Sequence, residues 1–134
     1  MNIKRLSLAI VIAYIVMSIL GITTDILLAE HMPQMKALGR MGADLEAHIM
    51  WMYLGYFVIT IIFCYIYVQK YAGKGWQEGA KYGFLIGLMM AGVTMVLYGT
   101  MPMDGKECAL SAVATIIIYM AGGISVDLVY KKDA

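Results

Sequence analysis

Residues 79–101 read GAKYGFLIGLMMAGVTMVLYGTM, and this stretch decides the fold class. Its one charged residue, Lys81, lies near the start, and about 20 uncharged helical residues are enough to cross a hydrocarbon core. Small residues recur in it every four positions, which places them on one face of a helix. We therefore expect a membrane-spanning helix with a narrow face made of Gly79, Gly83, Gly87 and Ala91.

Three further apolar blocks surround this one, at about residues 6–29, 47–69 and 108–130. Of the 134 residues, 62% are hydrophobic and 14% are charged, whereas about a quarter of a soluble domain is charged. We expect one membrane domain over residues 1–134. The expected fold is an all-α integral membrane protein, an up-and-down bundle of four transmembrane helices in which sequential helices with short connections are antiparallel neighbours.

The connection between the first two blocks has a pattern of its own. Apolar residues recur every three positions in it, at Met32, Met35, Leu38 and Met41. This spacing predicts a short interfacial helix within residues 31–43, with its apolar face on the membrane surface. Asp44 follows, where its carboxylate is expected to cap free N–H groups at the start of the second span.

The basic residues predict how the chain is oriented. Three of the ten, Lys36, Arg40 and Lys106, fall on one side of the four-span layout. The other seven fall on the opposite side: Lys4, Arg5, Lys70, Lys74, Lys81, Lys131 and Lys132. Lysine and arginine favour the cytoplasmic side, so both termini are expected to lie inside. The net charge of +1 provides no basic stripe for binding nucleic acid.

The glycine face of residues 79–101 has two interpretations. Lipid gives helices no hydrophobic reason to associate, so small residues promote association by allowing close backbone contact. The favoured interpretation is helix packing, within the chain or against another subunit. The alternative is a seam that opens in a transporter.

Asp25 and Asp127 are the acidic residues nearest the hydrocarbon. An ionisable residue inside a membrane is a functional candidate by default. Both lie near helix ends, however, where Asp25 can reach water and Asp127 can pair with Lys131 one turn later. The absence of an acidic residue at the centre of any span counts against a proton-coupled transporter.

Soft metal ligands gather on the expected outer side. Thioether, thiol and imidazole groups suit Cu(I), and the candidates are His48, Met50, Met52, Met101, Met103 and Cys108. Methionine is also a flexible apolar filler, and it is equally common inside residues 79–101. We expect a structural role for this set, with no metal and no cofactor. Cys64 and Cys108 belong to different spans and are not expected to form a disulfide.

Several short motifs resemble a widespread family of small, uncharacterised bacterial membrane proteins. They are residues 51–56 (WMYLGY), 73–75 (GKG), 78–83 (EGAKYG), 85–88 (LIGL), 98–102 (YGTMP), 128–130 (LVY) and the start, MNIKR. The resemblance implies a four-helix bundle in the bacterial inner membrane and transfers no catalytic residues. One departure is Asp104, where such sequences often have a second proline.

These observations favour a non-catalytic protein. No nucleophile with a nearby base and no phosphate-binding loop is present, so we do not expect an enzyme. The leading hypothesis is an accessory or scaffolding subunit that packs against another membrane protein or a second copy of itself in the lipid bilayer. The alternative is a small oligomeric transporter or channel, and a third hypothesis is copper handling by the outer methionines and histidine.

Overall fold

The computed structural model describes residues 2–130, and every regular element in that range is a helix. Four helices are long and apolar enough to cross a membrane, namely α1 (Ile3–Leu28), α3 (Gly42–Gln69), α4 (Trp76–Thr100) and α5 (Gly105–Tyr130). A short helix, α2 (Pro33–Leu38), follows the first span. The expected all-α membrane fold with four spans is therefore confirmed.

The region between α1 and α3 differs in detail from the expectation. Helix α2 covers only part of residues 31–43, because Pro33 starts it and Gly39 ends it in an extended conformation. Helix α3 begins at Gly42, before the expected residue 47, and Gly42 has a φ of 58°. Asp44 makes no capping hydrogen bond there. It forms an ion pair with Arg40 at 2.8 Å instead, so the expected cap is wrong.

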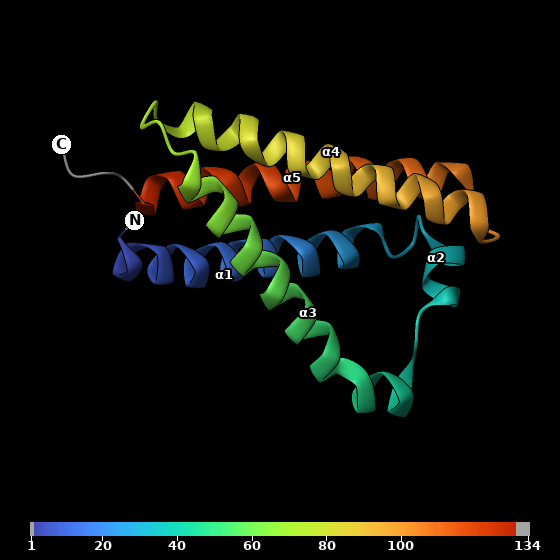
Figure 1. Ribbon diagram of the computed structural model, residues 1–134. Coiled ribbons are helices and arrows are strands. Elements are labelled where there is room, and N and C mark those ends of the chain that lie inside the picture. Colours follow the sequence, from blue (N-terminus) through green and yellow to red (C-terminus); the bar gives the residue numbers. More distant parts are fainter. Residues whose placement is uncertain (1, 131–134) are drawn as a thin grey trace.

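The molecule has two distinct ends. The start of α1, the end of α5 and the loop 70–75 share one end, which we call the termini end (Figure 1). The backbone N–H of Asn2 donates to the Tyr130 hydroxyl there at 3.1 Å. Helix α2 and the turn between α4 and α5 lie at the opposite end, which we call the α2 end (Figure 1).

Helices α4 and α5 make backbone-to-backbone contact along a glycine face. The buried residues of α4 are Gly79, Gly83, Gly87 and Ala91. A Cβ atom added to Gly79 would collide with the carbonyl oxygen of Gly123, and one added to Gly83 with that of Tyr119. The two spans are this close because these positions carry no side chain.

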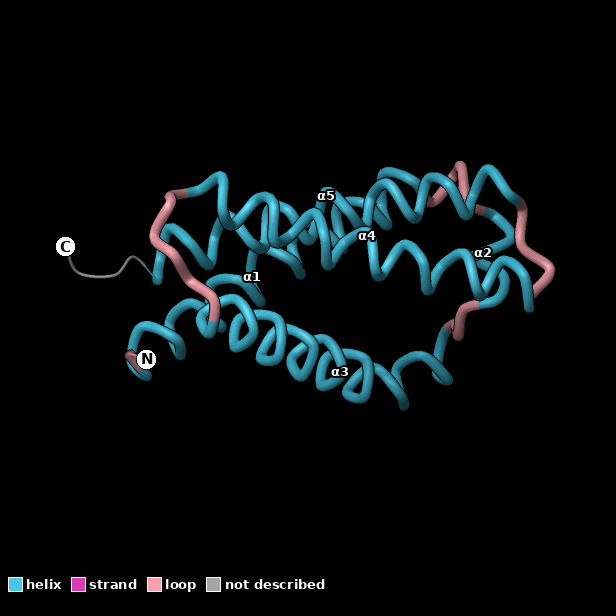
Figure 2. The backbone as a smooth tube through the Cα atoms, turned by 45° about the horizontal axis from the view of Figure 1, so that its top comes forward, coloured by secondary structure: helices cyan, strands magenta, loops and turns pink. Residues whose placement is uncertain are grey.

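Helix α5 is the central span because it presents small residues to two neighbours. Gly123 faces α4, while a Cβ atom on the preceding Gly122 would lie 2.7 Å from the sulfur of Met17 on α1. Helix α1 contributes Ala9 and Ala13, both completely buried. Consecutive glycines thus let α5 pack closely against α4 and α1 at once. The tube view shows α4 and α5 running alongside each other (Figure 2).

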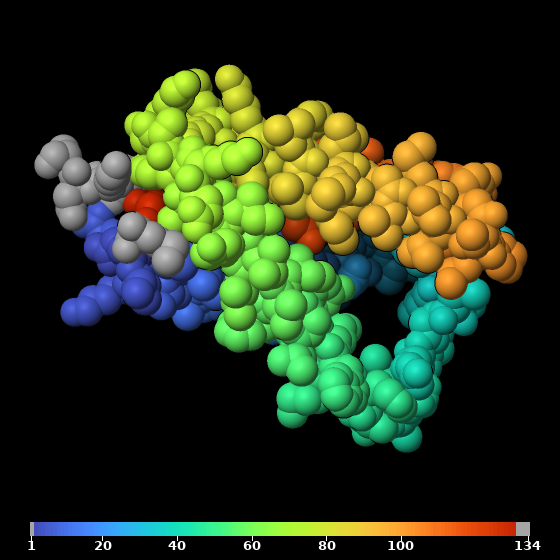
Figure 3. Space-filling model, in the orientation of Figure 1, coloured from blue at the N-terminus to red at the C-terminus, as the bar shows by residue number. Residues whose placement is uncertain are grey.

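Helix α3 packs most closely against the others toward the termini end, and its middle still contacts Tyr14 of α1 through Phe57 and the Tyr53 carbonyl. Its buried residues all lie in its second half: Thr60, Phe63, Cys64, Tyr67 and Val68. The first half diverges from the body of the protein and stands apart in the space-filling view (Figure 3). Among sequential helices, α4 and α5 therefore pack along their lengths, whereas α3 and α4 meet mainly through the rings of Phe63, Tyr67 and Tyr82. Residues 48–54 of α3 (HIMWMYL) all have large side chains, so close backbone approach is not favoured along this stretch.

Candidate functional site: a pocket between the four spans

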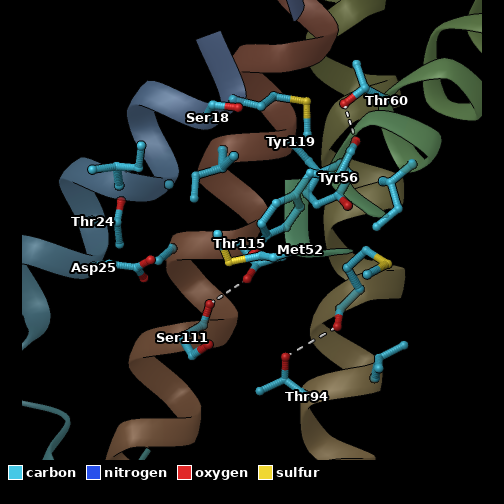
Figure 4. Close-up of a pocket in the computed structure, with 18 of the residues that line it drawn as sticks. Ser18, Thr24, Asp25, Met52, Tyr56, Thr60, Thr94, Ser111, Thr115 and Tyr119 are labelled. Carbon is cyan, nitrogen blue, oxygen red and sulfur yellow. Dashed lines mark hydrogen bonds between the residues drawn. The ribbon is translucent and has the colours of Figure 1, made fainter. Parts of the chain in front are cut away.

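The divergence of α3 leaves a pocket of about 420 Å³ in the half of the protein near the α2 end. All four spans line it (Figure 4). Most of the lining is apolar, including Met17, Met52 and Met90. The residues with polar side chains that line it are Tyr14, Ser18, Thr24, Asp25, Tyr53, Tyr56, Thr60, Thr94, Ser111, Thr115 and Tyr119.

An aromatic core closes the protein between this pocket and the termini end. Thr60 and Tyr119 line the pocket and are both buried, so they form its floor. The Tyr119 ring contacts Phe63 with ring centroids 5.6 Å apart, and Phe63 in turn contacts Tyr82 at 4.8 Å. The Tyr82 hydroxyl donates to the Phe63 carbonyl at 2.7 Å, which ties α4 to α3. One half of the bundle is thus packed and the other is open.

The polar groups of the pocket fall into two sets. The hydroxyls of Thr60, Thr94 and Thr115 each donate to the carbonyl four residues earlier in their own helix, at 2.8, 3.4 and 2.8 Å. The Asp25 carboxylate makes no hydrogen bond or ion pair with any residue in the range 2–130, and it is exposed within the open cavity. The pocket therefore contains a carboxylate that is available to an occupant.

Asp127, the second intramembrane candidate, lies outside the pocket in the packed half. It is completely buried although it is near the end of α5. The Tyr67 hydroxyl donates to its Oδ1 at 2.8 Å, and its Oδ2 has no hydrogen-bond partner in the described part of the chain. Gly79 makes room for it, since a Cβ atom there would lie 3.0 Å from the Asp127 Cβ. The expected partner, Lys131, lies outside the described residues.

The candidate copper ligands are placed in different surroundings. His48 is exposed on the diverging half of α3, where its Nδ1 lies 2.8 Å from the Asp44 carbonyl, and Met50 is 74% exposed. Met52 lines the pocket. Cys108 is buried on α5, with its sulfur 3.8 Å from the Thr94 carbonyl. Met101 lies at the end of α4, and Met103 follows in the turn. Residues 2–130 contain no group of three histidine, cysteine or acidic side chains that could hold a metal.

Two glutamates have structural roles that the sequence interpretation missed. Glu107, only 2% exposed, accepts hydrogen bonds from the backbone N–H groups of Gln34 at 3.1 Å and Met35 at 2.7 Å. It caps α2 from the first turn of α5. Glu78 accepts from the N–H groups of Ala72 and Lys74 and so stabilises the loop 70–75. The sequence signal for both was an acidic residue in the first turn of a helix, a position where carboxylates commonly accept from free backbone N–H groups.

Comparisons with protein-family models, with curated proteins and with solved structures find no match for this chain. The functional argument therefore starts from the geometry of the pocket.

Proposed function

We propose that the protein binds a small amphipathic molecule inside the bilayer, in the pocket between its four spans. The observation that carries this proposal is the unpaired Asp25 carboxylate in a cavity with mainly apolar walls. Small-molecule sites have this character, with volumes of about 300–1,000 Å³, apolar linings and a few polar groups that orient the ligand. The proposal corresponds to the binding step of the transporter hypothesis.

The divergence of α3 supports entry from the membrane. The pocket extends from α1 to the exposed half of α3, so its opening lies beside residues that face lipid. An amphipathic molecule dissolved in the bilayer has its polar group near the membrane surface. It would reach Asp25, one turn before the end of α1, without crossing the hydrocarbon centre.

A matched pair of glycine variants tests this proposal. Gly21 lines the pocket and Gly55 does not, and a Cβ atom at either would meet nothing within 4 Å. Gly21→Phe should fill the pocket without disturbing packing, while Gly55→Phe adds the same ring elsewhere. Both variants are reconstituted in lipid nanodiscs with short-chain amphiphiles that carry a photoreactive diazirine. Cross-linked residues are then mapped by mass spectrometry.

The expected result is labelling of pocket residues in the wild type and in Gly55→Phe, with loss of that labelling in Gly21→Phe. Labelling spread evenly over the lipid-facing surface, and unchanged by Gly21→Phe, would contradict the proposal.

A second proposal keeps the accessory-subunit hypothesis, because one observation favours it. The first half of α3 buries no residue in the described structure and exposes Met50, Trp51 and Leu54. Gly55 on the same half leaves open space for a helix of another subunit or a second copy to approach. Purification from native membranes in mild detergent should recover a stoichiometric partner that Gly55→Phe releases. A monomer without a partner would count against this second proposal.

We also propose that the chain lies in the bacterial inner membrane, with the termini end in the cytoplasm. The support is that Lys4, Arg5, Lys70 and Lys74 all belong to the termini end. Membership of the small four-helix family named above is likewise a proposal, supported by its sequence motifs.

A further inference from the structure

Asp25 gives the pocket a charge that nothing around it balances. Among the described residues that line the cavity, it alone has an acidic or basic side chain. An ionisable group at membrane depth is costly and normally has a partner. Among residues 2–130, no side chain or backbone group forms a hydrogen bond or an ion pair with this carboxylate. An occupant with a positive charge would supply it.

The surroundings of Asp25 suit an organic cation better than a metal ion. Hard cations such as Ca²⁺ need about six or more oxygen ligands, and Asp25 is the one carboxylate among the described residues of the lining. The pocket offers aromatic rings instead, from Tyr14, Tyr53, Tyr56 and Tyr119. The faces of such rings attract ammonium groups, and quaternary ammonium groups in particular.

The side chains that would hold such a cation come from different helices. Asp25 extends from α1 toward Ser111 and Thr115 of α5, and Tyr56 enters the same space from α3 (Figure 4). The apolar walls beyond them, with Met17 and Met90, provide room for a hydrocarbon group. The pocket therefore combines a carboxylate with apolar walls, and this arrangement complements an amphiphile that has a cationic head.

We propose that the pocket takes a lipophilic organic cation, with Asp25 as its counter-ion and the Tyr56 ring in the same space as the charged group. The inference names the ligand class of the binding site proposed above and rests on that proposal. An anionic amphiphile would be repelled by the Asp25 carboxylate. A neutral amphiphile would leave that carboxylate unbalanced in an apolar cavity.

Three diazirine probes with one chain and different head groups test the inference in nanodiscs. The heads are trimethylammonium, its neutral isostere tert-butyl, and sulfonate. The trimethylammonium probe should label pocket residues at about tenfold lower concentration than the tert-butyl probe, because it gains an ionic contact with Asp25 that the neutral head lacks. The sulfonate probe should not label the pocket.

Asp25→Asn keeps the shape of the side chain and removes its charge, so it should abolish the preference for trimethylammonium over tert-butyl. Asp44→Asn is the matched control, since Asp44 lies outside the pocket lining and pairs with Arg40. That variant should keep the preference. A preference that survives in Asp25→Asn would overturn the inference. Equal labelling by all three heads would overturn the cationic class and leave the proposed function intact, whereas absence of pocket labelling by every probe would overturn both.

Discussion

Gly87 on α4 lies against the backbone of α5, where a Cβ atom would be 2.7 Å from the Ile116 Cα and 3.2 Å from the Tyr119 Cβ. Backbone atoms cannot move aside as a flexible side chain can. Gly87→Leu should therefore separate the two spans and cost about 1–3 kcal/mol or more, as overpacking does. Gly92→Leu is the control, because nothing lies within 4 Å of a Cβ atom there. Thermal unfolding in detergent should show a clear loss for the first variant and little change for the second. Equal stability of Gly87→Leu and the wild type would contradict this contact.

The Tyr67 hydroxyl is the donor that the structure shows for the buried Asp127 carboxylate. Tyr67→Phe removes that donor and leaves both carboxylate oxygens without one in the described part of the chain. The expected loss of stability is about 1–3 kcal/mol. Tyr65→Phe on the same helix removes a hydroxyl that has no partner among residues 2–130 from an exposed ring, and it should be neutral. If Tyr67→Phe has no effect in an Asp127→Ala background, which lacks the acceptor, the hydrogen bond is the cause of its effect. Identical unfolding of Tyr67→Phe and Tyr65→Phe would argue against it.

At the scale of the element, α2 depends on a residue far away in the sequence. It is six residues long, has no buried residue and has no capping side chain of its own. So short a helix is marginal alone. The Glu107 carboxylate provides the missing acceptors for its first N–H groups and attaches it to α5.

Glu107→Ala should therefore release α2 while the four spans stay folded. Loss of a capping carboxylate typically costs about 0.5–2 kcal/mol. Hydrogen exchange measured by mass spectrometry should become faster for the amides of Gln34 and Met35. Glu46→Ala changes an exposed glutamate on α3 and should leave exchange in α2 unaltered. Unchanged protection of α2 in Glu107→Ala would show that other contacts hold it.

At the scale of the whole molecule, one half of the bundle is packed and the other is open. The packed half contains the aromatic residues of α3, α4 and α5 together with Ala9 and Ala13 of α1. The open half contains the pocket and the diverging part of α3. If the termini end is in the cytoplasm, as proposed above, the open half and its pocket lie toward the extracytoplasmic side of the membrane.

Reporter fusions test that orientation. Fusions at the C-terminus and at Gly73, in the loop 70–75, should both report the cytoplasm. A fusion at Leu38 in α2 should report the opposite side, because the positive-inside rule assigns the more basic end to the cytoplasm. A C-terminal fusion that is exported would contradict the proposed topology.

The four spans could be predicted from the sequence because the length and polarity of each block are local properties. A run of about 20 apolar residues is long enough to cross a bilayer whatever its neighbours are. The glycine spacing of residues 79–101 likewise marked a face for close contact before any partner was identified. Helix starts were predicted less well, as Gly42 and Trp76 show, because charged and polar first turns do not register in hydropathy.

The sequence by itself therefore determined the membrane class, the number of spans and the small-residue face of α4. Only the tertiary structure decided that α5 is central, that α3 diverges, that Glu107 caps α2 and that Asp25 lines a pocket while Asp127 is buried. These outcomes depend on which faces meet. Lipid solvates apolar side chains as well as another helix does, so the partners in a membrane are selected by close backbone approach and by hydrogen bonds between distant residues. Close approach and such hydrogen bonds both require atoms from separate spans to be brought together, and a local pattern of residues does not specify which spans will meet.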